Sequence, residues 1–199
     1  AILSGDQMMI EAYKKLALLP DDKLPQVLGW FNEMATSICE GQQYDIDFEH
    51  STTVSINDYL MMIEKKTALL LAHSLRIGAY IAGASTDEQE ALFQYGRHIG
   101  IAFQIQDDVL DVYGDPSSFG KAIGGDICCN KKTFLLLTAL DIADAESKAE
   151  LLQWLITSNQ NEEKIKAITS IYTRLGVRQI GEAVMEDHTA EALAQLELL

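Results

Sequence analysis

The side chains best suited to chemistry lie in the segment FQIQDDVLD, residues 103–111. On a helix that turns about 100° per residue, Gln104, Asp107, Asp108 and Asp111 fall within about 100° of one another and so share one face. Three ionised carboxylates on one face repel each other, and a hard cation between them relieves that repulsion. Mg2+ prefers oxygen ligands and keeps positions for water and substrate phosphates, so the segment predicts a magnesium site.

The acidic stripe also has a simpler interpretation, in which it is an ordinary solvated helix face. The rest of the helix argues against this, because most of its other positions are apolar. These apolar positions are Ile101, Phe103, Ile105, Val109, Leu110 and Val112. A helix with so wide an apolar surface is packed on most sides, so we expect the narrow stripe to face a cavity or solvent.

A glycine-rich loop follows the acidic helix and brings positive charge. Its helix-breaking residues are Gly114, Pro116, Gly120, Gly124 and Gly125, and its charged residues include Lys121, Asp126, Lys131 and Lys132. Glycine and proline interrupt regular structure, so we expect a loop that folds back within reach of the helix end. Carboxylates that bind metal ions and ammonium groups that bind phosphate oxygens would together hold a diphosphate.

Two segments upstream carry polar groups that could join this site. Gln42 and Asp45 are three residues apart, hence on one helix face, and Lys66 with Thr67 interrupts a strongly apolar stretch. The first pair is also explained as a polar helix exit, and the lysine as a side chain whose stem extends along the surface to solvent. If its ammonium group is instead surrounded by apolar side chains, it needs an anion as partner.

Length and composition limit the possible functions. The 199 residues, 48% of them hydrophobic, suffice for one domain with a large core, and a net charge of −15 argues against a nucleic-acid backbone as partner. Three cysteines form neither an even set nor a CxxC pair, and no leader peptide or membrane-spanning run is apparent. We therefore expect a cytoplasmic protein with no membrane span.

The hydrophobic pattern predicts an all-α protein with a single helical domain over residues 1–199. Nearly every segment has a period of about 3.6 residues, and none shows sustained alternation. Two helices are expected first, over residues 2–19 and 23–49. A long helix should then run from the capping box of Ser55 and Asp58 to about Ala84, and the next, capped by Thr86, should continue into the acidic stripe. Further helices are expected over residues 134–143, 146–157 and 162–175, and a last helix is expected to be separated from these near Gly181. Residues 134–199 are expected to be scaffold.

The remaining residues give no sign of other chemistry. GxSxG, HExxH and P-loop patterns are absent from the sequence. The four histidines, His50, His73, His98 and His188, lack the spacing of metal ligands. We expect each histidine to be structural or at the surface.

The chemistry-bearing segments resemble those of the trans-type isoprenyl diphosphate synthases. FQIQDDVLD, YGDPSSFGK and GGDICCNKKT resemble the second aspartate-rich motif and its lysine loop, and GQQYD and KTA resemble two further family segments. The resemblance implies an isoprenoid-synthase-type helical bundle around a central cavity. It also implies a homodimer that uses Mg2+, with Mn2+ as a possible substitute, to condense an allylic diphosphate with isopentenyl diphosphate.

The same resemblance implies roles for individual residues. Asp107, Asp108 and Asp111 would bind Mg2+, with Asp126 nearby through water. The residues with catalytic roles would be Lys66, Thr67, Gln104 and Lys121, and the substrate-binding residues would be these four with Gln42, Asp45 and Lys131.

The sequence departs from the family pattern in one respect. Family members have two aspartate-rich motifs that face each other across the cavity, and residues 1–199 contain only the second. The resemblance therefore covers roughly the C-terminal two thirds of a family member, and the bundle is expected to be incomplete at its N-terminal side. We expect this chain alone to be inactive, because one metal cluster cannot neutralise the leaving group without its opposing carboxylates.

Three alternatives remain open at this point. A non-catalytic partner subunit of a heteromeric prenyl synthase would share the helices but usually loses carboxylates or lysines that are present here. A class I terpene cyclase would share the metal-triggered ionisation but lacks this order of motifs. A helical interaction module is the simplest alternative, and diphosphate binding would distinguish it from a synthase.

Overall fold

The computed structural model describes residues 2–115, 123–157 and 162–199, and these ranges contain helices but no strand. The elements in chain order are α1 (Ile2–Leu16), α2 (Leu24–His50), α3 (Ile56–Ile63), the π-helical turn η1 (Glu64–Ala68), α4 (Leu69–Ala82), α5 (Thr86–Tyr113), α7 (Gly125–Cys128), α8 (Phe134–Ile142), α9 (Ala145–Ile156), α10 (Glu162–Arg174) and α11 (Val177–Leu196). The predicted all-α class is confirmed. Among the described residues, none of the helices combines the length and the apolar character that a membrane span requires.

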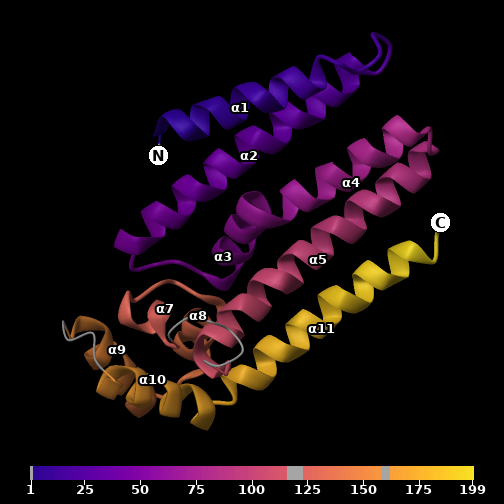
Figure 1. The fold of residues 1–199 in the computed structure, drawn as a ribbon. Coiled ribbons are helices and arrows are strands. Elements are labelled where there is room, and N and C mark those ends of the chain that lie inside the picture. Colours follow the sequence, from indigo (N-terminus) through magenta and orange to yellow (C-terminus); the bar gives the residue numbers. More distant parts are fainter. Residues whose placement is uncertain (1, 116–122, 158–161) are drawn as a thin grey trace.

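The long helices lie side by side in the order α1, α2, α4, α5 and α11 (Figure 1). Helix α5 is therefore flanked by α4 on one side and α11 on the other. The short helices α7 to α10 gather near the end of α5 that carries the acidic segment (Figure 1). This arrangement holds the acidic segment between several elements.

Helix α5 begins one residue earlier than predicted. The capping side chain is that of Ser85, which accepts a hydrogen bond from the backbone N–H of Glu88, while the Glu88 carboxylate accepts one from the Ser85 N–H. The prediction of Thr86 as the cap is therefore wrong, because the reciprocal hydrogen bonds of a capping box form one residue earlier, between Ser85 and Glu88. The capping box predicted for Ser55 and Asp58 is confirmed.

The last helix begins at a different glycine from the one predicted. Gly176, at φ +69°, precedes α11, and this left-handed conformation suits glycine. Gly181 lies inside α11, where a Cβ atom would come within 3.3 Å of the side chains of Leu135 and Val109. The predicted break at Gly181 is wrong because the glycine there permits close helix packing, not a turn.

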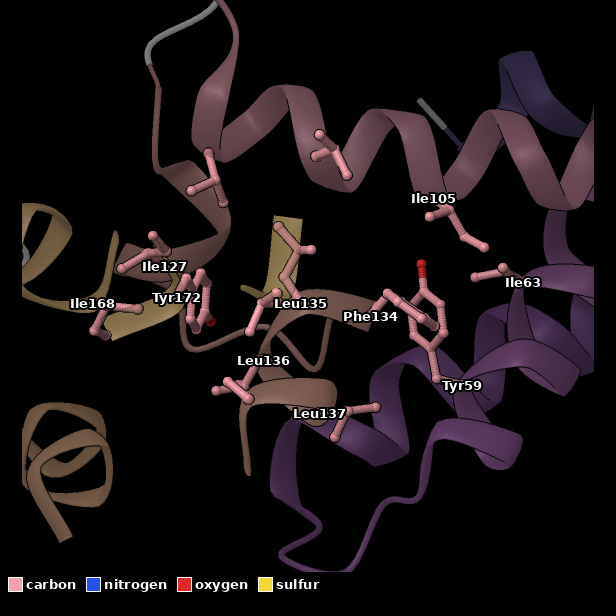
Figure 2. Close-up of a cluster of buried hydrophobic side chains, with 14 of the residues drawn as sticks. Tyr59, Ile63, Ile105, Ile127, Phe134, Leu135, Leu136, Leu137, Ile168 and Tyr172 are labelled. Atoms are coloured by element: carbon pink, nitrogen blue, oxygen red, sulfur yellow. The ribbon is translucent and has the colours of Figure 1, made fainter. Parts of the chain in front are cut away.

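The core lies beneath the acidic end of α5. Its largest fully buried side chains include Tyr59, Ile105, Leu135 and Ile171, and they come from four different helices. Figure 2 shows Tyr59 next to Phe134 of α8, with the tyrosine hydroxyl directed toward α5. The acidic segment is thus supported by a packed core.

Two histidines join α5 to α11. His98 and His188 approach to 3.0 Å between their Nδ1 atoms, so one ring must donate and the other accept. Burial is the main cause that lowers the pKa of each histidine below the ordinary 6.5. The nearby Arg97 and the partner ring act in the same direction on His188, while Glu191 opposes it.

We expect the contribution of the histidine pair to stability to fall as the pH is lowered through the range just below 6.5, while the raised pKa of Asp108 acts in the opposite direction. The folded protein favours neutral imidazole rings, so the unfolded state binds more protons. The stability that the neutral histidines contribute is fully present above the unfolded pKa and is lost as the pH falls through the folded pKa. Urea unfolding at about pH 7.5 and about pH 5.5 measures the effect. His188→Gln should become relatively more stable than the unsubstituted chain as the pH falls from about 7.5 to about 5.5. An equal change in the two proteins would contradict the assignment to the histidine pair.

Candidate functional site

One pocket brings side chains of opposite charge together. It has a volume of about 200 Å³ and is lined by Asp45, Tyr59, Met62, Ile63, Lys66, Gln104, Asp107, Asp108 and Lys131. These residues come from α2, α3, η1, α5 and the segment before α8. Larger hollows occur elsewhere, such as one of about 600 Å³ beside α9, but the smaller pocket brings together six of the residues that the sequence singled out.

The three carboxylates of the predicted acidic stripe lie in different environments in the folded chain. Asp107 lines the pocket and is partly exposed, whereas Asp108 is only 2% exposed. Asp111 does not line the pocket, and its Oδ2 accepts a hydrogen bond from the Asp126 N–H at 3.1 Å. Helical spacing placed the three carboxylates on one face, but the neighbouring elements give each a different environment.

Asp108 is held by two donors from other elements. The Tyr59 hydroxyl of α3 donates to Oδ2 at 2.6 Å, and the Phe134 N–H at the start of α8 donates to the same oxygen at 2.9 Å. Burial raises the pKa of Asp108 to about 6, and the hydrogen bonds from Tyr59 and Phe134 oppose that rise. Oδ1 accepts no hydrogen bond from the described part of the chain.

The segment after α7 adds a lysine beside the acidic residues. Lys131 lies in the pocket, and its Nζ is 3.7 Å from Oδ1 of Asp126. Burial lowers the pKa of Lys131, but the charges of Asp126, Asp108, Asp45 and Asp107 outweigh it and the net shift is upward. The ammonium group therefore stays charged beside the acidic residues of the site.

Lys66 enters the pocket from a π-helical turn. The turn η1 interrupts the long helix predicted from Ser55 to Ala84. π-Helical turns are rare inside α-helices and frequently occur at functional sites. The Nζ of Lys66 lies 2.5 Å from Oδ2 of Asp45, so the lysine has the anionic partner that the sequence left undecided.

Neighbouring groups hold η1 closely. The Arg97 guanidinium makes two hydrogen bonds of 2.8 Å to the Glu64 carboxylate at the start of the turn. A Cβ atom at Gly41 would lie 2.5 Å from the Lys66 backbone nitrogen, and one at Gly100 would lie 2.4 Å from Ala68 Cα. The middle and the last residue of η1 therefore pack against helix backbone at positions where only glycine fits.

Thr67 and Gln104 also meet at the site. The Thr67 hydroxyl donates to Oε1 of Gln104 at 3.3 Å, across the contact between η1 and α5. This hydrogen bond links the two segments that carry Lys66 and the acidic residues. It orients the Gln104 amide, which lines the pocket.

Of the predicted site residues that the structure describes, four do not line the pocket: Gln42, Thr67, Asp111 and Asp126. Gln42 is exposed and does not line it, although Asp45 from the same segment does. Lys121 lies outside the described residues. Lys132, next to Lys131, lines the separate hollow beside α9 instead.

Sequence reasoning missed Tyr59, Met62 and Ile63 as pocket residues. Tyr59 was considered only as part of the long helix that begins at the capping box, although it precedes Lys66 by two helical turns and could share its direction. A buried tyrosine usually finds a hydrogen-bond partner, and this general rule was the available signal.

The oxygen donors of the pocket fit Mg2+ as a partner shared with a phosphate ligand. Among residues 2–115, 123–157 and 162–199, no three His, Cys, Asp or Glu side chains form a group able to hold a metal by themselves. Mg2+ is commonly bound by one or two carboxylates together with water and substrate phosphates. Asp107 and Asp108, with the Gln104 amide beside them, match that kind of incomplete protein site.

Comparison with known proteins gives consistent matches. The polyprenyl synthetase family model matches residues 1–172. A short chain isoprenyl diphosphate synthase from Methanocaldococcus jannaschii is 40% identical over 172 residues, which are 86% of this chain and 52% of that protein.

Solved structures agree with this match. A geranylgeranyl pyrophosphate synthase aligns with a TM-score of 0.93 and 39% identity, over 100% of this chain and 62% of that one. The Corynebacterium glutamicum geranylgeranyl pyrophosphate synthase, complexed with isoprenyl diphosphate and magnesium, aligns with a TM-score of 0.89 and 32% identity, over 100% of this chain and 57% of that one. The chain thus spans between 52% and 62% of the length of these three relatives.

Proposed function

The chain belongs to the polyprenyl synthetase family, and from this premise we propose that it forms the diphosphate-binding part of a prenyltransferase. The enzyme would join an allylic diphosphate to isopentenyl diphosphate, releasing diphosphate and a longer isoprenyl diphosphate. The observation that carries this proposal is that Lys66 and Lys131 line the same pocket as Asp107 and Asp108.

The lysines would hold the departing diphosphate. As the bond between the allylic carbon and the diphosphate oxygen breaks, negative charge grows on that oxygen, and preorganised ammonium groups stabilise it. Lys66 is kept in position by Asp45 at 2.5 Å, and Lys131 by the carboxylates around it. Bound Mg2+, held by Asp107 and Asp108, would neutralise further phosphate charge.

The remaining pocket residues would orient the substrate and limit access of water. Thr67 fixes the Gln104 amide, which then presents its donor group toward the phosphate oxygens. Met62 and Ile63 form an apolar part of the pocket wall, which would keep water from the allylic cation. Isopentenyl diphosphate then attacks this cation and loses a proton.

Further features belong to the same proposal. The metal would be Mg2+, with Mn2+ as a substitute, because both accept hard oxygen ligands. The protein would act as a cytoplasmic homodimer on allylic and isopentenyl diphosphates. The structure describes three cysteines, Cys39, Cys128 and Cys129, all in the free thiol form, which is compatible with a reducing compartment.

Mg2+ should be required for diphosphate binding. With about 100 times the dissociation constant of inorganic pyrophosphate present, native-state binding adds about 2.7 kcal/mol. For a chain of this size the melting temperature should rise by roughly 5–10 °C. Thermal unfolding followed by circular dichroism measures the rise, which should disappear when EDTA replaces Mg2+.

Two outcomes of this measurement would contradict the proposal. No rise with Mg2+ and pyrophosphate would favour a helical interaction module. An equal rise in EDTA would show that the acidic residues do not act through a metal. Inorganic phosphate at the same concentration serves as the control for general anion effects.

The 199-residue chain by itself should give no prenyl-transfer product. Its sequence carries one aspartate-rich segment, whereas the proposed ionisation needs charge stabilisation from two sides. Chromatographic detection of products from geranyl and isopentenyl diphosphates tests this, using a sample already shown to bind Mg2+ and pyrophosphate. Turnover by a 22.0 kDa species would overturn the prediction.

A further inference from the structure

We infer that Tyr59 is a positioning residue of the diphosphate site, acting through Asp108 to fix the acidic helix α5 against the lysine-bearing turn η1. The inference rests on the proposed function, because it concerns how that site is assembled. The inference assigns a role in the site to an uncharged residue that lies outside the acidic and lysine-bearing segments.

The first support is the geometry at Asp108. The Tyr59 hydroxyl and the Phe134 N–H both donate to Oδ2, at 2.6 and 2.9 Å. One carboxylate oxygen is thereby fully occupied, and the other, Oδ1, is left for the pocket that Asp108 lines. Two donors on one oxygen fix both the position and the rotation of the carboxylate.

The second support is the burial of the hydrogen bond. Tyr59 and Asp108 are each only 2% exposed, so water cannot easily replace the hydroxyl as a donor. Loss of the hydroxyl would leave Oδ2 with the Phe134 N–H, one donor in place of two, and a buried carboxylate that loses a donor is destabilised. The Asp108 carboxylate would then turn toward other donors, and its alignment with a phosphate-bound cation would be lost.

The third support is the place of Tyr59 in the chain. Tyr59 belongs to α3, which continues directly into η1 and Lys66. One hydroxyl therefore connects the element that carries the acidic residues with the element that carries the lysine. Figure 2 shows this hydroxyl directed toward α5 from the side of the core.

The ring of Tyr59 has a separate, structural role. It packs against Phe134 with ring centroids 6.2 Å apart, and it is part of the core cluster. Tyr59→Phe keeps this packing and removes only the hydroxyl. The substitution therefore separates positioning of Asp108 from packing of the core.

The test is calorimetric titration of the chain with pyrophosphate in Mg2+. We expect Tyr59→Phe to weaken binding by about tenfold, the loss typical of one buried hydrogen bond to a charged group. Tyr172→Phe is the matched control, because Tyr172 is also 2% exposed in the same core and does not line the pocket. This control should change the dissociation constant by less than about twofold.

The outcomes separate a positioning role from a structural one. If Tyr59→Phe and Tyr172→Phe weaken pyrophosphate binding equally, the cause is a loss of core stability and the inference is overturned. The inference is also overturned if Tyr59→Phe does not weaken pyrophosphate binding. Failure of the unsubstituted chain to bind pyrophosphate would instead overturn the proposed function. Circular dichroism spectra establish that each variant is folded at the temperature of the titration.

A second comparison tests whether Tyr59 acts through Asp108. In an Asp108→Asn background, adding Tyr59→Phe should weaken binding by less than about twofold, because the carboxylate it positions is already gone. A further tenfold loss would show that the hydroxyl acts independently of Asp108, and the inference would be wrong.

Discussion

Lys66→Met is expected to weaken Mg2+-dependent pyrophosphate binding by about thirtyfold, since one hydrogen bond to a charged group contributes about 2 kcal/mol. The Lys66 ammonium group lies in the pocket, 2.5 Å from the Asp45 carboxylate. Its removal also leaves the Asp45 charge unpaired beside the incoming phosphate. Both effects act in the same direction, and isothermal titration calorimetry measures their sum.

The neighbouring lysine provides the control. Lys65 pairs with Glu40 at 2.6 Å and does not line the pocket. Surface ion pairs contribute about 0–1 kcal/mol, so Lys65→Met should change binding by less than about threefold. Similar losses for the two variants would mean that overall charge, not the position of Lys66, governs binding.

Gly41→Ala is expected to destabilise the chain by about 2–3 kcal/mol, which is typical when extra volume is forced into a packed contact. The added Cβ would lie 2.5 Å from the Lys66 nitrogen and 2.8 Å from its Cα. Backbone atoms cannot move aside as a flexible side chain can, so α2 and η1 must separate. Urea unfolding measures the loss of stability, and weaker pyrophosphate binding should accompany it because Lys66 moves.

A glycine in the same helix gives the matched comparison. A Cβ at Gly29 would meet nothing within 4 Å, although Gly29 also lies in α2. Alanine has the higher helix propensity, so Gly29→Ala should stabilise the chain by up to about 1 kcal/mol. Destabilisation of the same size at both positions would indicate that the contact with η1 is not the cause.

The local sequence determined much of the helical architecture. The 3.6-residue period predicted the all-α class, and the capping box of Ser55 and Asp58 marked the start of α3 correctly. The boundaries at Thr86 and Gly181 were wrong, because a neighbouring serine made the better cap and a glycine served helix packing. Caps depend on a few adjacent residues, whereas a glycine can serve either a turn or a close contact.

The sequence by itself also selected most of the residues that meet in the pocket. It identified Asp45, Lys66, Gln104, Asp107 and Lys131 from their chemical types, their spacing and their resemblance to family motifs. These signals suffice because charged side chains inside apolar segments are costly without partners. Spacing alone could not decide which partner each charge would find.

Only the tertiary structure distinguished residues that are chemically alike and adjacent. Lys66 enters the pocket while Lys65 pairs with Glu40, and Asp108 is buried against Tyr59 while Asp107 stays partly exposed. A helical period fixes the direction of a side chain around its own axis. Its environment depends on which distant elements pack there, and that is decided by long-range contacts of α2, α3, η1, α5 and α8.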